Sequence, residues 1–257
     1  MGALSKTKSK TKHSAAVQEA FNFSVTVCYA MKALQAHLDA VQSGTEAPIA
    51  PFYYAANQNS VSELKTHLNK FESALSRYLL LSVFSFFEAF IKAIIDELIE
   101  FHRGVPSMIR TAEKRDKRFI AKITKEMSTQ RYKLREKRLP ARKERYRKFT
   151  RLLEAEGFRF PTETLSSYGV RKFAEDFSKL KAYAIPDFLI HALHVPLEAA
   201  DVEYFHEIRT LRNTIAHGDA ENLSLAQISK INDLFRNWTS LIEDHLLTNY
   251  FIIEDYS

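Results

Sequence analysis

A run of 25 largely apolar residues, RYLLLSVFSFFEAFIKAIIDELIEF at 77–101, constrains the fold of this chain more than any other segment. By length and composition it fits either a membrane span or a core helix. Glu88, Lys92, Asp96 and Glu97 argue against the span, because a charge is costly at the centre of a bilayer. We therefore expect a buried core helix and no membrane partner.

The rest of the chain also predicts helices, so the expected fold class is all-α. The segment SVSE at 60–63 is a capping-box signature that opens the long helix, and the connection at 42–60 reads as a loop. No stretch alternates as a strand would. Further helices are expected from the apolar spacing over 14–41, 162–181, 184–196, 199–217 and 223–248.

Length and cysteine content bound the organisation of the protein. The 257 residues fit one large domain, which we place at 14–257. Residues 1–13 are polar and basic, and we expect a disordered tail there. A single cysteine, Cys28, rules out a disulfide framework and favours a reducing, cytoplasmic location.

Charge is concentrated in one element. Residues 103–151 contain 19 Lys and Arg against 5 Asp and Glu, a net charge of +14, whereas the remaining residues carry −8. This pattern predicts a basic helical insertion over 103–160, broken near Pro140, with a polyanionic partner and RNA before other candidates. The alternatives are a solvated helix, docking on the chain's own acidic residues, and docking on an acidic protein.

Basic and aromatic side chains alternate in this insertion. Tyr132, Tyr146 and Phe149 can stack on unpaired bases, while the cations neutralise phosphates without reading sequence. The candidate RNA-binding residues are Lys114, Arg115, Lys117, Arg118, Arg131, Lys133, Arg135, Lys137, Arg138, Arg142, Lys143, Arg145, Arg147 and Lys148.

The segment RTLRNTIAHGDAE at 209–221 contains the candidate catalytic residues. On a helix Arg209, Asn213 and His217 follow one another at i, i+4 and i+8 and form one polar stripe, with Arg212 beside it. Gly218 is placed to end the helix. Spacing alone also allows an ordinary interpretation, in which the histidine interacts with the helix dipole and the arginines pair with carboxylates.

The motif RNTIAH at 212–217 resembles the R-x4-H motif of the HEPN superfamily. Phe87, Glu88, Ala89 and Phe90 are similar to an aromatic-Glu-small-aromatic pattern on the long helix of the RiboL-PSP branch. The resemblance covers about 60–103 and 162–248 and leaves the basic element as an insertion. It implies a HEPN-like helical bundle.

The same resemblance implies a metal-independent endoribonuclease without a cofactor, of the kind found in bacterial toxins and phage-defence effectors. His217 would transfer protons, Arg212 would stabilise charge on the phosphate, and Asn213 would bind a phosphate oxygen or orient His217. Glu88, paired with Arg209 or Arg212, would support them. Family members pair as homodimers with a composite active site, and tRNA is a family substrate.

Two features keep other interpretations open. Relatives neutralised by a nucleotidyltransferase antitoxin carry Tyr two residues after the histidine, where this chain has Asp219, so that route of regulation is in doubt and another antitoxin or defence-system partner stays open. A non-catalytic HEPN-like module for RNA or protein binding is the alternative function. His191 and His194 form a candidate metal pair without an evident third ligand, and we expect no metal there.

Overall fold

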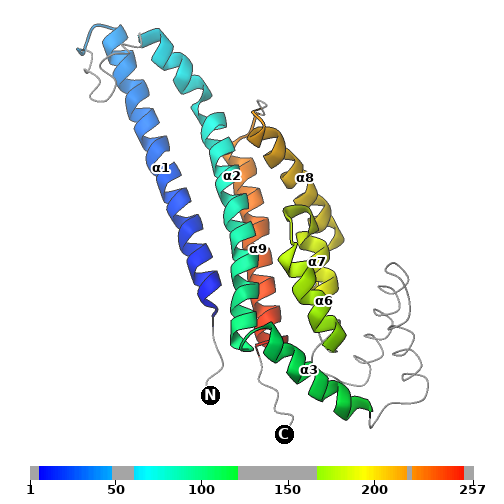
Figure 1. The fold of residues 1–257 in the computed structure, drawn as a ribbon. Coiled ribbons are helices and arrows are strands. Elements are labelled where there is room, and N and C mark those ends of the chain that lie inside the picture. The colour runs from blue at the N-terminus through cyan, green and yellow to red at the C-terminus, as the bar shows by residue number, and fades with distance from the viewer. Residues whose placement is uncertain (1–5, 48–60, 121–166, 219–221, 252–257) are drawn as a thin grey trace. The chain divides into compact units, whose positions relative to one another are not determined.

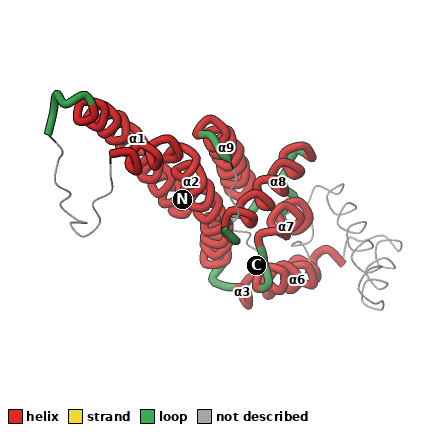
Figure 2. Tube along the Cα trace, turned by 90° about the horizontal axis from the view of Figure 1, so that it is seen from above, coloured by secondary structure: helices red, strands yellow, loops and turns green. Residues whose placement is uncertain are grey.

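The computed structural model of the chain describes residues 6–47, 61–120, 167–218 and 222–251, and these residues form helices and the turns between them (Figures 1 and 2). No strand occurs among them, which confirms the all-α prediction. The helices are α1 (Lys8–Gln42), α2 (Val61–Phe101), α3 (Val105–Ile120), α6 (Ser167–Ser178), α7 (Ile185–Ala192), α8 (Ala199–Ala216) and α9 (Leu225–Asn249), with a 3-10 turn at Ala182–Ala184.

The chain divides into two compact units. One comprises Met1–Thr11, Glu88–His206 and Arg236–Ser257, and the other comprises Lys12–Phe87 and Glu207–Phe235. We call them the terminal unit, because it contains both ends of the chain, and the motif unit, because it contains the RNTIAH segment.

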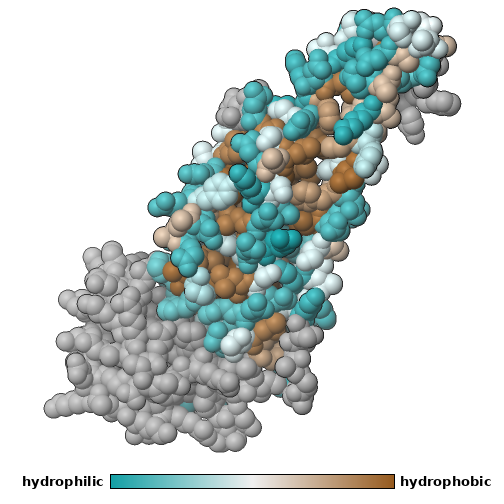
Figure 3. All heavy atoms as spheres, turned by 180° about the vertical axis from the view of Figure 1, so that it is seen from behind, coloured by the Kyte–Doolittle hydropathy of each residue, from teal (hydrophilic) through white to brown (hydrophobic). Residues whose placement is uncertain are grey.

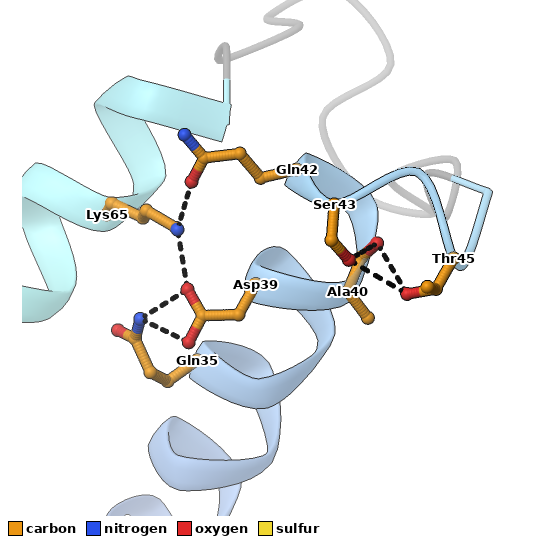
Figure 4. Close-up of polar contacts among 7 residues, drawn as sticks. All are labelled: Gln35, Asp39, Ala40, Gln42, Ser43, Thr45 and Lys65. Carbon is orange, nitrogen blue, oxygen red and sulfur yellow. Dashed lines mark hydrogen bonds and ion pairs between the residues drawn. The ribbon is translucent and has the colours of Figure 1, made fainter.

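In the motif unit α1 and α2 run antiparallel. Contacts at both ends of the pair show this: the ring of His13 lies 3.2 Å from the carbonyl oxygen of Phe86, and Lys65 binds Asp39 and Gln42. Figure 4 shows this second contact, in which Lys65 reaches across from α2 to the end of α1. The hydrogen bond from Lys65, helped by one from Gln35, lowers the pKa of the Asp39 carboxyl below its usual value.

Contacts between residues far apart in the sequence stabilise the terminal unit. The hydroxyl of Tyr250 donates to the carbonyl oxygen of Leu193 at 2.9 Å, and the indole of Trp238 stacks on Phe205 with centroids 5.4 Å apart. α3 packs against α6, where Arg171 pairs with Glu113.

The N-terminus differs from the expected disordered tail, because α1 begins at Lys8. Thr7 donates its amide and its hydroxyl to the buried Glu243 carboxylate at 2.7 and 2.8 Å. Glu97 accepts from the amides of Lys8 and Ser9 and from the Ser9 hydroxyl. Two carboxylates thus accept from the amides of Thr7, Lys8 and Ser9, a stabilisation that local composition does not reveal, while the amide of Lys10 donates to the Thr7 hydroxyl oxygen. Residues 1–5 lie outside the described part.

The long apolar helix lies where the sequence places it. Ser62–Phe101 is the one helix among the described residues that is long and apolar enough to cross a membrane, and half of its most apolar window is buried within the protein. Leu80, Val83, Ile91 and Ile94 are each fully buried. Core helices of folded domains show such burial, as we expected for this segment.

The remaining helices agree with the predicted ranges except α7, which was expected over 184–196 and ends at Ala192. α6 lies within the expected 162–181, and α8 and α9 begin and end within two residues of the prediction. α3 confirms helix at the start of the basic insertion. The expected capping residue Ser60, most of the loop at 42–60, and the break near Pro140 lie outside the described residues.

Candidate active site

The end of α8 positions the predicted catalytic residues. Arg212 and Asn213 lie in its last turns, and His217 follows the last helical residue. The backbone N–H of His217 donates to the carbonyl oxygen of Asn213 at 3.0 Å, so the histidine closes a final turn. Gly218 then adopts φ +97°, a left-handed conformation that glycine reaches without a Cβ penalty. The predicted helix stop is confirmed.

Arg212 is held by an aromatic ring and an amide. Its guanidinium carbon lies 5.5 Å from the centroid of the Phe84 ring, within the range of a cation–π contact. Its Nη1 donates to Oδ1 of Asn213 at 3.0 Å. Arg212 is half-buried, so the side chain is oriented without being sealed from solvent.

An aromatic cluster lies beneath this contact. Phe84, Phe87 and Phe235 are almost completely buried. Phe87 stacks on Phe235 with centroids 4.5 Å apart, and Phe84 meets Phe235 edge-to-face at 5.8 Å. The apolar run predicted that the first two rings are buried. It carried no signal that Phe84 is the ring that meets Arg212, so this positioning residue was missed.

Arg209 supplies a second cation one turn before Arg212. Its Nε atom is buried and has no hydrogen-bond partner among the described residues. An orphaned donor on an arginine is costly unless a ligand or water completes it. Arg209 therefore presents unused hydrogen-bonding capacity beside the motif.

His217 is exposed, as a residue that must reach a substrate needs to be. The helix rise places it about 7.5 Å beyond Arg212 along the axis. The two side chains differ in kind: a guanidinium is a planar cation that matches phosphate oxygens, and an imidazole is a common proton-transfer group in active sites. Together they offer charge stabilisation and proton transfer at one helix end.

Glu88 stays a prediction as a supporting residue. It is half-exposed on α2 and belongs to the terminal unit, whereas Arg209 and Arg212 belong to the motif unit.

Little of the predicted RNA-binding surface is described. Lys114 is exposed near the end of α3. The same helix contains Arg115, Lys117 and Arg118, whose side chains lie outside the described part. Residues 131–148 lie wholly outside it.

The expectation that His191 and His194 lie on one helix is wrong. α7 ends at Ala192, and His194 lies beyond it with φ +53°, so His191 and His194 do not share a helix face. His191 instead lies 3.8 Å from Asp187. Among the described residues no group of three or more His, Cys, Asp or Glu is arranged to hold a metal ion.

The geometry defines an all-α domain with an Arg-Asn and His constellation at the end of one helix. Residues 54–248 match the family model described as RiboL-PSP-HEPN. The chain belongs to this HEPN family, which includes ribonucleases. No curated protein and no solved structure matches the chain. The matched range includes the RNTIAH segment and the basic insertion, and it excludes α1.

Proposed function

We propose that this protein is a metal-independent endoribonuclease whose active site is the end of α8. The observation that carries the proposal is the contrast between Arg212, held on Phe84 and Asn213, and the exposed His217 that follows in the next turn. A fixed cation is suited to stabilise charge on the phosphate, and a solvent-facing imidazole is suited to transfer protons. RNA cleavage requires both. The matched family supports this assignment, because it includes ribonucleases.

In the proposed reaction the RNA supplies its own nucleophile. His217 takes the proton of a ribose 2′-OH, whose oxygen attacks the adjacent phosphorus while the bond to the 5′-oxygen breaks. Arg212, with Asn213, stabilises the charge on the phosphate oxygens, and Arg209 adds a positive charge one turn earlier. Protonation of the departing 5′-oxygen leaves a 2′,3′-cyclic phosphate and a 5′-OH. DNA lacks the 2′-OH and is not cleaved.

One histidine and one arginine per chain form a small catalytic set. We propose that two chains bring their motifs together across a composite site, so that one His217 acts as base and the other as acid. The basic insertion grips RNA, with tRNA as a candidate substrate, and a toxin or phage-defence effector in the cytoplasm is the biological role we propose. An antitoxin or defence-system protein would then be its partner.

The test compares purified protein with the His217→Ala variant on total RNA and on DNA, in excess EDTA. His67→Ala is the matched control, because His67 is an exposed histidine on α2, outside the motif. We expect fragments with 2′,3′-cyclic phosphate ends from the unaltered chain and from the control, and none from His217→Ala. Equal cleavage by all three proteins refutes the proposal. Intact RNA that binds to all three proteins favours the alternative, a non-catalytic RNA-binding module.

A further inference from the structure

Arg77 of α2 is a half-buried arginine that the proposed reaction does not use. Among the described residues nothing joins it by a hydrogen bond, an ion pair or a cation–π contact, and none of its nitrogens is buried. Figure 3 shows hydrophilic residues spread among apolar ones on the face drawn there, where such side chains extend into water. Arg77 differs from these because the protein covers its stem, while the donors of its guanidinium stay available to a ligand.

The end of α8 lies toward the N-terminal end of α2. The amide of Leu225 at the start of α9 donates to Glu72 at 3.4 Å, whereas Phe235 lies farther along α2, in the aromatic cluster, so α9 is parallel to α2. α8 is antiparallel to α9, because Phe205 near its beginning stacks on Trp238 in the second half of α9. α8 therefore runs antiparallel to α2 as well.

Arg77 is level with His217 in this arrangement. Arg212 lies over Phe84, and His217 is about 7.5 Å from Arg212 toward the N-terminal end of α2. Arg77 precedes Phe84 by about two helical turns, about 10 Å in the same direction, and projects from the same side of α2. Arg77 and His217 are therefore offset by about 3 Å along the axes of two helices that pack against each other.

No acidic residue occurs on either of the helix segments that meet here. Residues 73–87 of α2 and 208–218 of α8 contain three arginines and His217 but neither Asp nor Glu. The chain outside 103–151 has a net charge of −8, so this absence is local. A positive surface of this kind attracts polyanions, and a planar guanidinium binds phosphate oxygens with two parallel hydrogen bonds.

We propose that Arg77 binds the RNA phosphate next to the one that reacts. Arg212 is held on Phe84 and serves the reacting phosphate, whereas the guanidinium of Arg77 lies beyond His217 along the axis and is placed for a neighbouring phosphate of the same strand. The site then takes an RNA chain rather than a single phosphodiester. This inference rests on the proposed active site and extends it to the length of RNA that is bound.

Binding of oligouridylate in the His217→Ala background tests the contact without cleavage. Arg77→Gln keeps the apolar stem and removes the charge, so we expect about fivefold weaker binding at low salt. The slope of log K against log salt should become shallower by about 0.7, the contribution of one phosphate contact on a single strand. Arg77→Lys should keep the slope. The matched control is Lys32→Gln, which removes an exposed cation on α1 and should bind like the background protein.

Urea unfolding of Arg77→Gln should match that of the background protein, which excludes unfolding as the cause of weaker binding. A salt slope that is unchanged in Arg77→Gln overturns the proposal, and so does a background protein that does not bind oligouridylate at low salt.

Cleavage by the chain with His217 intact places the contact relative to the reacting phosphate. Arg77→Gln should raise KM about fivefold and leave kcat unchanged, because the phosphate that it contacts does not react. A fall in kcat at unchanged KM would place Arg77 at the reacting phosphate and overturn the assignment. If the unaltered chain cleaves no RNA, the proposed nuclease activity fails, whereas the binding experiment still decides whether Arg77 contacts phosphate.

Discussion

The guanidinium of Arg212 lies over the ring of Phe84, 5.5 Å from its centroid, while its Nη1 bonds to the neighbouring Asn213. The motif arginine is thus oriented by a residue more than a hundred positions earlier in the chain. Because Phe84 is fully buried within the cluster with Phe235, the position of the cation depends on the packing of the core.

Phe84→Leu tests this dependence. Leucine keeps the site apolar and removes the ring face, so we expect cleavage of RNA to fall about tenfold, equivalent to a cation–π contact of roughly 1.4 kcal/mol. Phe173→Leu, a buried phenylalanine on α6, is the control for core packing. Both variants should lose about 1–2 kcal/mol of unfolding free energy in urea, and activity should fall in the first alone. Equal activities of the two variants would show that Phe84 does not position Arg212 for cleavage.

Gly218→Ala tests the end of α8. A Cβ at Gly218 meets no atom within 4 Å, so any cost comes from the left-handed backbone at φ +97°. We expect a loss of about 1–2 kcal/mol in thermal or urea unfolding, and reduced RNA cleavage because the preceding His217 shifts. Gly218→Asn should be milder, since asparagine tolerates this conformation. If the Gly218→Ala variant is as stable as the unaltered chain, residue 218 does not adopt the left-handed conformation that ends α8.

The lowered pKa of His245 predicts that the fold loses stability in acid. Burial lowers the pKa of its imidazole, although the contact with the Leu193 carbonyl oxygen at 2.8 Å raises it in part. In the unfolded chain the group binds a proton near pH 6.5, more readily than in the folded chain. Stability should therefore be fully present above about pH 6.5 and decline as the pH falls toward the lower folded value.

The measurement is unfolding free energy against pH for the unaltered chain and His245→Gln, whose amide is able to donate to the same carbonyl. The variant should lose less stability below pH 6.5, and His67→Gln should follow the unaltered chain. Parallel curves for all three proteins would show that His245 does not contribute to the acid response.

Glu97→Gln tests the fastening of the N-terminus. Burial disfavours the charged carboxylate of Glu97, but hydrogen bonds from Ser9 and Lys8 more than offset this and lower its pKa. Removing the charge should cost about 1–2 kcal/mol, in the range of a lost helix cap. Amide hydrogen exchange should rise at residues 8–13, and Glu100→Gln, which is exposed on the same helix, should leave it unchanged.

Most of the fold could be predicted from helical periodicity. It predicted α2, α8 and α9 because each buries a regular apolar stripe, and Gly218 predicted the end of α8 because its position follows the last periodic residue. The start of α1 at Lys8 was not predictable, since the local sequence is polar and its stability comes from Glu97 and Glu243, far along the chain. For the same reason the motif residues could be predicted from the sequence, whereas the contact of Arg212 with Phe84 could not.

The hydrogen bonds from Thr7 to Glu243 join residues 236 positions apart, so the start of α1 is completed by a residue of α9. Until α9 has been synthesised, the carboxylate that caps the start of α1 does not exist in the nascent chain. Contacts of such long sequence separation form late and slowly. A chain cut short before Glu243 would contain the whole RNTIAH segment but would lack these hydrogen bonds to Thr7.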